Sequence, residues 1–382
     1  MQRPRPRVAL IVETSTAYGR KILEGISKFV STHERWSLFV DERELNAPPP
    51  DWLLDWDGDG IICRSTTPEL AQQLRRRKIS VVDLNDRFGN LGLPHVESDM
   101  RALGVLAAQH LVDCGFGQIA FCGYRDEKWS ESRLEGLRSV AAPCATFESP
   151  LLNLRKGDWD HDQSELREWV RSLPKPVGIV ACNDVRALHV LDACESLGLI
   201  VPGEVSVVGI DNSETFCSLC NPSLSSVVPN ASAVGYEAAA MLDMILSGHR
   251  PRSESVLIAP KGIVVRQSSD SVAVSDRLVA ESLRFIREHL REKIDVANVA
   301  TFAKVSRSTL ERRFSSAIGQ TPHEAIARAR LARALKLLSE TTWPLSRVAD
   351  EVGYSHAEYL ITVVEKATGQ SPSTYRVTKK RS

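Results

Sequence analysis

The sequence contains no long apolar run and no excess of either charge. None of its apolar stretches reaches the roughly 18 residues that a membrane-spanning helix needs. The apolar stretch Val8–Val12 follows a basic start but ends at Glu13, so it is too short for a signal peptide. We therefore expect a cytoplasmic protein that has no membrane partner.

Recognisable catalytic signatures are also missing. The sequence has no glycine loop that could cradle a phosphate, no HExxH motif and no Gly-x-Ser-x-Gly motif. Most of its eight cysteines lie in apolar contexts, such as those of Cys63, Cys122 and Cys182, which is typical of reduced, buried thiols. Cys217 and Cys220 form one CxxC pair, but a structural zinc ion needs four ligands and no second Cys or His pair is near. We therefore expect no enzymatic activity, no cofactor and no metal.

The overall charge balance hides an uneven distribution along the chain. The 382 residues include 48 Lys and Arg and 48 Asp and Glu. Residues 276–382 contain 19 basic and 12 acidic residues, so residues 1–275 contain the remaining 29 basic and 36 acidic ones. A chain of this length suggests two or three domains. The C-terminal part alone has the charge of a nucleic-acid-binding domain.

Short β-rich runs alternate with amphipathic stretches through the first part of the chain. Strands are predicted at 8–13, 36–41, 59–63, 80–84, 118–123, 177–182 and 205–211. Helices are predicted at 68–77, 100–113, 130–140, 164–173 and 183–197, and a helical pattern also runs through Ile22, Ile26 and Phe29. The alternation predicts parallel sheets with helices on both faces, and its length predicts two α/β lobes.

An internal repeat follows the Ser- and Asp-rich segment 266–276, where the strand signals end. Leu310, Phe314, Ala317, Gly319, Gln320 and Pro322 recur fifty residues later as Leu360, Val364, Ala367, Gly369, Gln370 and Pro372. Each copy predicts a short helix, a turn and a second helix, with the turns near 304–305 and 353–355. The capping-box pattern Thr321–Glu324 predicts a connecting helix to Ser339, about 27 Å long.

Two helix-turn-helix units on a rigid connector have a geometric consequence for DNA. Their second helices could enter successive major grooves, about 34 Å apart. Because Leu310 and Phe314 are predicted to pack inward, the side chains that project outward toward base edges are those of Arg307, Ser308, Glu311 and Arg312. Candidates for phosphate contacts are Arg313, Arg328, Arg330, Lys379, Lys380 and Arg381. The alternative is a helical bundle with a solvated basic face, and the duplicated turn and cap pattern counts against it.

Residues 277–376 resemble the DNA-binding domain of the AraC/XylS transcription regulators. The resemblance implies that the base readers lie mainly on 306–315, and that the corresponding positions of the second unit are Ala357, Glu358, Ile361 and Thr362. The second unit departs from the family pattern, since Leu360 and Val364 replace a common Phe and Thr362 replaces a common Arg. We therefore expect the second unit to read few bases and mainly to position the protein.

The segments 181–214 and 221–246 resemble the effector domain of LacI-type repressors, and a weaker resemblance extends from residue 8 to 266. The resemblance implies an α/β two-lobed, periplasmic-binding-protein-like effector domain at 1–266, a linker at 267–276 and an all-α double helix-turn-helix domain at 277–382. We expect no LacI-type DNA-binding headpiece, because the first strand is predicted at residue 8. The domain order is that of a subfamily of xylose-responsive regulators. It implies operator DNA, RNA polymerase and a second copy of the chain as partners, and D-xylose or a related pentose as effector.

The ligand of a two-lobed α/β protein lies between the lobes, at the carboxyl ends of the strands. Strand-end polar residues are Glu13, Asn183, Asp184 and Asp211, although Asp184 could equally cap the next helix. The resemblance implies that Arg133, Asn183 and Asp211 contact the sugar. Tyr18 and Trp129 are candidates for the aromatic plate that often lies against the C–H face of a sugar.

Several alternatives stay open at the level of the sequence. The effector could be another pentose or a hexose, and the chain could bind a sugar without any role on DNA. A sugar-processing enzyme would need a catalytic acid/base pair or a cofactor loop, and we find neither. Among regulators we expect an activator, with a repressor as the alternative.

Overall fold

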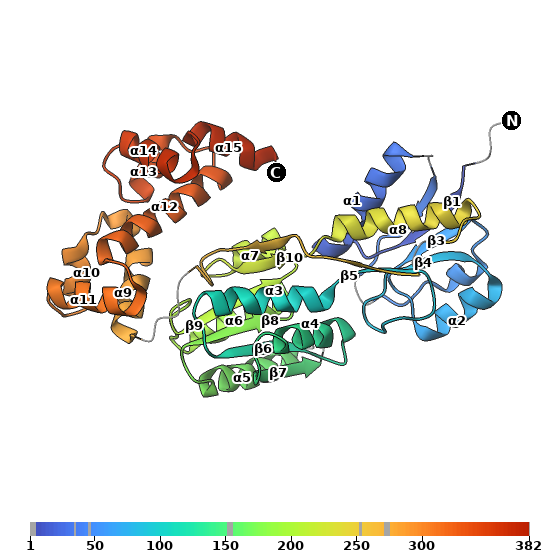
Figure 1. Cartoon of the computed structure of the whole chain (residues 1–382), viewed down its shortest axis with the longest axis horizontal. Coiled ribbons are helices and arrows are strands. Elements are labelled where there is room, and N and C mark those ends of the chain that lie inside the picture. Colours follow the sequence, from blue (N-terminus) through green and yellow to red (C-terminus); the bar gives the residue numbers. More distant parts are fainter. Residues whose placement is uncertain are drawn as a thin grey trace. The chain divides into compact units, whose positions relative to one another are not determined.

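The computed structural model describes residues 5–33, 36–44, 47–150, 156–251, 254–270 and 276–381. The chain divides into two compact units, 1–271 and 272–382. The first unit is α/β and the second is all-α (Figure 1). This division into an α/β part and a helical part was predicted.

The first lobe of the α/β unit is built on a six-stranded parallel sheet of order β11-β5-β4-β3-β1-β2. Its strands are β1 (Arg7–Ile11), β2 (Ser37–Val40), β3 (Gly60–Cys63), β4 (Ser80–Asp83), β5 (His95–Ser98) and β11 (Ser255–Ile258). Helices α1 (Ala17–Thr32) and α8 (Ala231–Leu246) pack on each other and on one apolar core, while the short η1 (Asp51–Asp55) and α2 (Pro68–Arg77) pack on the other.

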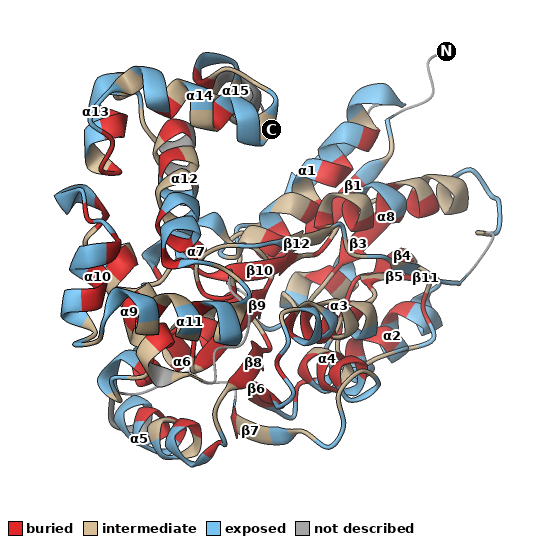
Figure 2. Ribbon diagram, turned by 60° about the vertical axis from the view of Figure 1, so that its left-hand side comes forward, coloured by how far each residue is buried: buried red, intermediate tan, exposed pale blue. Residues whose placement is uncertain are grey.

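The second lobe holds the sheet β12-β10-β9-β8-β6-β7, which is parallel except for β12. Its strands are β6 (Ile119–Arg125), β7 (Ala145–Pro150), β8 (Val177–Ala181), β9 (Val205–Ile210), β10 (Ser225–Val228) and β12 (Gly262–Val264). Its helices are α3 (Met100–Asp113), α4 (Lys128–Arg138), α5 (Lys156–Ser172), α6 (Asp184–Ser196) and α7 (Glu214–Leu219). The buried strands form the red centre of this lobe in Figure 2.

The chain passes between the lobes three times, and these passages lie side by side. They follow β5, β10 and β11. The backbone N–H of Asp99 donates to the carbonyl of Ile258 at 2.8 Å, and that of Lys261 donates to the carbonyl of Val228 at 2.9 Å. Three short, adjacent connections leave the two lobes able to rotate about one narrow region.

All seven predicted strands exist, and the predicted helices 68–77 and 100–113 match α2 and α3 to the residue. The unpredicted strands β5, β7, β10, β11 and β12 have three to six residues each. Strands such as HVES and ATFESP have too little alternation of apolar and polar residues to be recognised in the sequence. They form because neighbouring strands supply their pairing.

The predicted linker 267–276 begins too early. Residues 267–270 belong to the first unit, where the Ser268 side chain is fully buried. Ser268 Oγ accepts from the N–H of Ser225 at 2.8 Å and donates to the carbonyl of Val207 at 2.6 Å. A Ser-rich segment lacks apolar residues but can still be held by hydrogen bonds, which the composition rule does not take into account. Residues 271–275 lie outside the described residues.

The second unit confirms the predicted repeat. It consists of α9 (Arg277–Glu288), η2 (Leu290–Glu292), α10 (Val296–Phe302), α11 (Arg307–Ile318), α12 (Pro322–Glu340), α13 (Leu345–Glu351), α14 (Ala357–Thr368) and α15 (Pro372–Arg381). The pairs α10–α11 and α13–α14 are the two helix-turn-helix units. The repeated positions Leu310, Phe314, Leu360 and Val364 are all fully buried.

The turns of the repeat use the expected left-handed backbone. Lys304 has φ 54° in the first turn and Gly353 has φ 79° in the second. Gly319 and Gly369 end α11 and α14 with φ 65° and 69°. A Cβ at Gly353 would also lie 2.2 Å from the carbonyl oxygen of Leu290, so this turn requires glycine for both its conformation and its packing.

The capping box at the start of α12 is formed as predicted, and its removal has a defined expected cost. Thr321 Oγ1 accepts from the N–H of Glu324 at 3.2 Å, while the Glu324 carboxylate accepts from the N–H of Thr321 at 2.7 Å. We expect Thr321→Ala to lower the stability of the helical unit by about 1 kcal/mol. Scanning calorimetry of the full chain checks this, with Thr321→Ser as the control that keeps the acceptor. Equal melting of the alanine and serine variants would contradict it.

Candidate effector cavity and DNA-binding helices

A cavity of about 440 Å³ lies between the two lobes of the first unit. This volume is in the range of small-molecule sites. Its lining includes all seven residues that the sequence singles out, namely Glu13, Tyr18, Trp129, Arg133, Asn183, Asp184 and Asp211. The first two come from the first lobe and the others from the second, so residues far apart in the sequence meet at one place as predicted.

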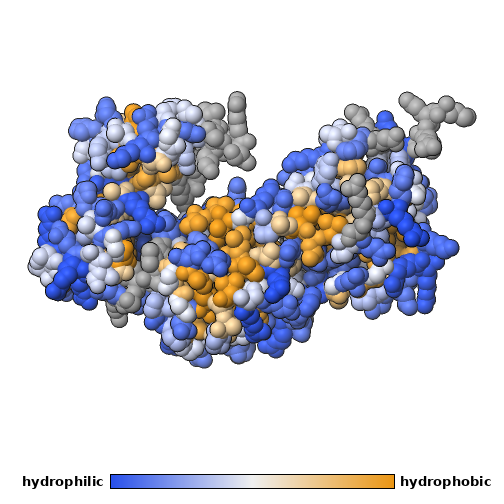
Figure 3. Space-filling model, viewed as in Figure 1, coloured by the Kyte–Doolittle hydropathy of each residue, from blue (hydrophilic) through white to orange (hydrophobic). Residues whose placement is uncertain are grey.

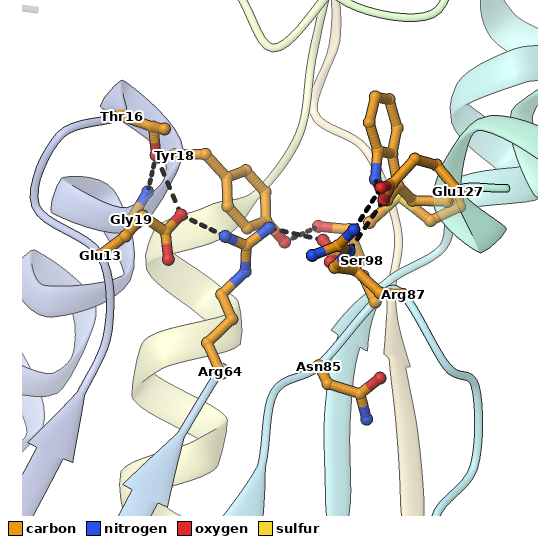
Figure 4. Close-up of polar contacts among 12 residues, drawn as sticks. Glu13, Thr16, Tyr18, Gly19, Arg64, Asn85, Arg87, Ser98 and Glu127 are labelled. Carbon is orange, nitrogen blue, oxygen red and sulfur yellow. Dashed lines mark hydrogen bonds and ion pairs between the residues drawn. The ribbon is translucent and has the colours of Figure 1, made fainter. Parts of the chain in front are cut away.

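The wall formed by the first lobe is a network of paired charges (Figure 4). Glu13 follows β1, is nearly fully buried, and accepts hydrogen bonds from Arg64 and from Thr16 Oγ1, the latter at 2.9 Å. Arg64 also pairs with Asp86 at 2.5 Å. Its guanidinium carbon lies 4.9 Å from the ring centroid of Tyr18. This guanidinium therefore fixes both a carboxylate and an aromatic ring at the cavity wall.

The hydroxyl of Tyr18 is held at the edge of the cavity. It lies 2.8 Å from Ser98 Oγ, at the end of β5. Burial raises the pKa of Tyr18 to about 12, so the phenol stays protonated at neutral pH. A protonated phenol can donate as well as accept, which suits a neutral ligand that carries hydroxyl groups.

Arg133 is the central cation of the second lobe's wall. It projects from α4, is 3% exposed, and donates to Asp211 Oδ1 at 3.2 Å and to the carbonyl oxygen of Cys182. Its guanidinium carbon lies 5.0 Å from the ring centroid of Trp129, one helical turn earlier. The indole and the guanidinium thus stack as a single rigid surface.

Asn183 and Asp184 both serve the fold at the start of α6 while they line the cavity. Asn183 Oδ1 accepts from the N–H of Arg186 at 2.8 Å and caps the helix, which leaves its amide NH₂ as the group that can donate. Asp184 is nearly fully buried and accepts from Ser226 Oγ at 2.5 Å and from the N–H of Ser213 at 2.6 Å. Asn183 supplies the helix cap that the sequence offered as an alternative role for Asp184, and the Asp184 carboxylate is instead satisfied by Ser213 and Ser226, outside α6.

Asp211 is held in an unusual backbone conformation. Its φ is 112°, and that of the following Asn212 is 45°, so two consecutive non-glycine residues adopt positive φ. Such strain persists where the surrounding structure fixes it and is common at binding sites. Burial raises the pKa of Asp211, and the nearby positive charge of Arg133 opposes that shift.

Several cavity residues were not predicted from the sequence. They are Arg64, Asp86, Arg87, Glu127 and Phe216. Arg64 directly follows β3 and Glu127 closely follows β6, so the strand-end rule could have found them. Phe216 lies on α7, where apolar surface gathers in Figure 3, and is 37% exposed. The arginines Arg64, Arg87 and Arg133 each pair with a carboxylate, which favours an uncharged ligand.

The buried Asp184 predicts a pH effect on stability. Burial, and secondly the negative charge of Asp211, raises the pKa of Asp184 to about 7, from an ordinary value of 3.8. Because the folded state holds this proton more tightly than the unfolded state, this contribution to stability is lost as the pH rises toward and through about 7. We expect Asp184→Asn, which cannot ionise, to gain melting temperature relative to the parent as the pH rises from about 4 to about 7, the interval between the ordinary and the raised pKa, and the difference to level off above it. Melting curves of both chains across that range check this; parallel curves would contradict it.

The predicted base-reading residues of the first helix-turn-helix unit lie on the accessible face of α11. Arg307, Ser308 and Arg312 are exposed and Glu311 is partly exposed. Arg307 Nε donates to Glu311 Oε1 at 2.9 Å, one helical turn away. This pair must open or move as a unit if both side chains are to contact base edges.

The side chains of the second unit that were predicted to face DNA lie on α14 and are less exposed than those of α11. Glu358 and Thr362 are exposed, whereas Ala357 and Ile361 are partly buried. Thr362 Oγ1 donates to the carbonyl of Glu358 at 3.1 Å, so its hydroxyl is already used within the helix. Tyr359, which was not predicted, is 59% exposed beside them and lies edge-on to Tyr354.

Arg330 and Arg313, which were predicted to contact phosphate, are engaged within the protein. Arg330 donates to the carbonyl of Ile294 at 2.9 Å and stacks 5.4 Å from the centroid of Tyr354, which indicates a structural role. Arg313 Nε donates to Asp276 at 2.7 Å. Arg328 is exposed on α12. The side chains of Lys379, Lys380 and Arg381 lie outside the described residues.

Among the helices of the described residues, none is both long and apolar enough to cross a membrane. No group of three or more His, Cys, Asp or Glu side chains within the described ranges is arranged to hold a metal ion. Cys217 and Cys220 are both free thiols, and Cys217 Sγ lies 3.6 Å from Asp184 Oδ2.

Comparison with known proteins gives consistent matches over both units. Residues 7–94 match the XylR N-terminal domain, residues 108–269 a periplasmic binding protein-like domain, and residues 299–378 a helix-turn-helix domain. The xylose operon regulatory protein of Escherichia coli (strain K12) is 30% identical over 97% of this chain and 97% of its own. That of Haemophilus influenzae is 30% identical over 97% of this chain and 98% of its own.

A solved structure agrees over nearly the whole length. It is described as a xylose-binding transcription activator, xylR, and it matches with a TM-score of 0.82 at 28% identity, covering 99% of each chain. The match covers both units in the same order, so the similarity includes the α/β unit as well as the helical unit. The chain therefore belongs to the family of the xylose operon regulatory proteins, DNA-binding transcription regulators that join a periplasmic-binding-protein-like domain to an AraC-type helix-turn-helix domain.

Proposed function

We propose that this regulator takes D-xylose as its effector in the cavity between the lobes, and that it acts in the cytoplasm, where its DNA target lies. The observation that carries the proposal is the composition of the cavity: paired charges, fixed hydroxyl and amide groups, and aromatic rings from both lobes. The full-length relatives named as xylose operon regulators support the choice of sugar.

The cavity provides the two kinds of contact that a neutral sugar needs. Arg133, Asn183 and Tyr18 can donate hydrogen bonds, and the carboxylates of Glu13 and Asp211 can accept them. Trp129 and Tyr18 supply aromatic faces for the C–H groups of the sugar. Because the ligand contacts both lobes, it binds the closed arrangement more tightly than the open one and shifts the population toward closure.

On DNA, we propose that α11 reads bases through Arg307, Ser308, Glu311 and Arg312, while α14 mainly positions the protein through Ala357, Glu358, Ile361 and Thr362. The balance of exposed polar side chains between the two helices supports this division. We further propose that the chain acts as a homodimer on paired half-sites and as an activator that recruits RNA polymerase. Its role is then regulatory and not enzymatic.

A different pentose, or a hexose, is the second candidate for the effector. The volume and polar groups of the cavity are compatible with any small neutral sugar, and the differences among pentoses are the orientations of single hydroxyl groups. The names of the full-length relatives favour xylose over the other pentoses.

Thermal-shift measurements on the full chain with a panel of pentoses and hexoses test this proposal. A ligand that binds only the folded state raises the melting temperature by mass action, by an amount that grows with its concentration. We expect D-xylose to give the largest shift, confined to the transition of the effector unit. A larger shift with another sugar would reassign the effector, and no shift with any sugar would contradict a sugar site.

A further inference from the structure

The Arg87–Glu127 ion pair differs from the other ion pairs of the cavity because it joins the two lobes. Arg87 lies in the loop between β4 and β5 of the first lobe, and Glu127 lies between β6 and α4 of the second. Arg64 instead pairs with Glu13 and Asp86 of its own lobe, and Arg133 pairs with Asp211 of its own lobe. Figure 4 shows the Arg87 side chain meeting Glu127 beside the cavity.

The geometry of this pair is that of a strong contact. Arg87 Nε donates to Glu127 Oε2 at 3.0 Å and Arg87 Nη2 donates to Oε1 at 2.5 Å, so both carboxylate oxygens are engaged. Two parallel charge-assisted bonds are stronger and more directional than a single contact. Glu127 is 2% exposed, so losing Arg87 would leave a buried carboxylate short of partners.

Glu127 also fixes the aromatic plate of the cavity. The indole N–H of Trp129 donates to Glu127 Oε2 at 2.8 Å, and the ring also contacts the Arg133 guanidinium and, edge-on, the ring of Tyr124. The orientation of Trp129 is thus set by the same carboxylate that binds the opposite lobe. Closure of the lobes and placement of the plate are coupled through one side chain.

We infer that Arg87 and Glu127 form an interlobe latch that stabilises lobe closure by protein contacts alone, and that Glu127 is the positioning residue for Trp129. The latch stabilises lobe closure in addition to the effector, because Arg87 and Glu127 contact each other directly and need no ligand between them. A regulator of this kind has a closed population before its effector arrives. The effector then needs less differential affinity to complete the shift. The part concerning Trp129 rests on the proposed sugar site.

Hydrogen exchange of the sugar-free full chain tests the latch directly. We expect Arg87→Ala to speed amide exchange several-fold in two segments that belong to opposite lobes, 84–92 and 126–134. The matched control is Arg77→Ala, which removes an arginine that pairs with Asp55 at 3.2 Å within the first lobe and does not line the cavity. Unchanged exchange in both segments of the Arg87→Ala chain would overturn the latch, whatever the protein does with sugars.

Titration calorimetry with D-xylose separates the latch from the positioning role. We expect Arg87→Ala and Glu127→Gln to weaken xylose binding about 5- to 10-fold, since Gln keeps an acceptor for Trp129 but loses the charge. Glu127→Ala should weaken it further because the indole also loses its acceptor. Because xylose is uncharged, salt can change the affinity for xylose only through charges of the protein. The affinity of the parent should therefore fall at high salt, and that of Arg87→Ala should not change with salt. Equal affinity of Glu127→Gln and Glu127→Ala would overturn the positioning role.

The two proposals fail in different ways. If the parent chain binds no sugar but Arg87→Ala still speeds exchange in both segments, the latch stands and the proposed effector is wrong. If the parent binds xylose and Arg87→Ala changes neither exchange nor affinity, the proposed function stands and the latch is wrong.

Discussion

Replacing Arg133 with alanine should weaken effector binding by about 100-fold or more. Arg133 is 3% exposed and pairs with Asp211, while also donating to the carbonyl of Cys182. A hydrogen bond from a charged donor is worth about 1.5–3 kcal/mol, and Arg133 also orients Asp211, so about 3 kcal/mol of binding free energy is lost, at roughly a factor of ten in affinity per 1.4 kcal/mol. The variant also loses the cation that stacks on Trp129. Calorimetric titration with D-xylose, at a temperature where the chain is folded, measures the loss.

A matched variant separates binding from stability. Arg186 is fully buried in the same lobe and pairs with Asp162 at 2.6 Å, but it does not line the cavity. Arg186→Ala should therefore lower the melting temperature as Arg133→Ala does, while leaving the affinity of the folded chain for xylose near that of the parent. A comparable loss of affinity in both variants would show that the effect of Arg133→Ala is only general destabilisation.

The second large effect is expected on DNA. Arg312 is exposed on α11 near Arg307 and Glu311. These three side chains lie on the accessible side of the helix, whereas Leu310 and Phe314 are buried on its inner side. A bidentate contact between arginine and guanine discriminates by about 10- to 100-fold. Arg312→Ala should weaken operator binding by that amount and relax the preference at one base pair. Binding isotherms on an operator fragment and on its single-base variants measure both changes.

The internal repeat supplies the control for this prediction. Thr362 stands fifty residues after Arg312, at the equivalent position of α14, and its hydroxyl already bonds to the carbonyl of Glu358. Thr362→Ala should change operator affinity by less than about threefold, since this helix is proposed to position the protein. If Arg312→Ala weakens binding to random DNA as much as to the operator, Arg312 contacts phosphate and does not read a base.

The sequence predicted best what depends on local periodicity. The fifty-residue repeat placed Leu310, Phe314 and their partners in the core, and the turns at Lys304 and Gly353 have the left-handed backbone that a tight turn requires. These features follow from residues three or four positions apart. They do not depend on how the rest of the chain folds.

The cavity was predicted only in part because it is formed by both lobes. The rule that ligands gather at strand ends brought Glu13 together with Asn183 and Asp211, which both lie more than a hundred residues later in the sequence. The strand-end rule could have found Glu127, but its pairing with Arg87 depends on how one lobe faces the other, and no periodicity within either segment encodes that. The satisfied carboxylate of Asp184 was likewise visible only once Ser213 and Ser226 were in place.

The same reasoning explains the misplaced linker. Composition alone cannot distinguish a free Ser-rich segment from one whose hydroxyls are bonded, as at Ser268. The bonds that hold Ser268 come from β9 and β10, more than forty residues earlier in the chain.

The most direct test of the whole account is selection of genomic DNA by the purified full chain, with and without D-xylose. Fragments from the organism that encodes the protein would be captured at fixed salt and sequenced for the parent and for Arg133→Ala. We expect a small set of fragments that share paired half-sites, with an enrichment that changes with xylose in the parent but not in Arg133→Ala. Capture of the same unrelated fragments in all conditions, or a response to xylose that survives Arg133→Ala, would contradict control of DNA binding by a sugar in this cavity.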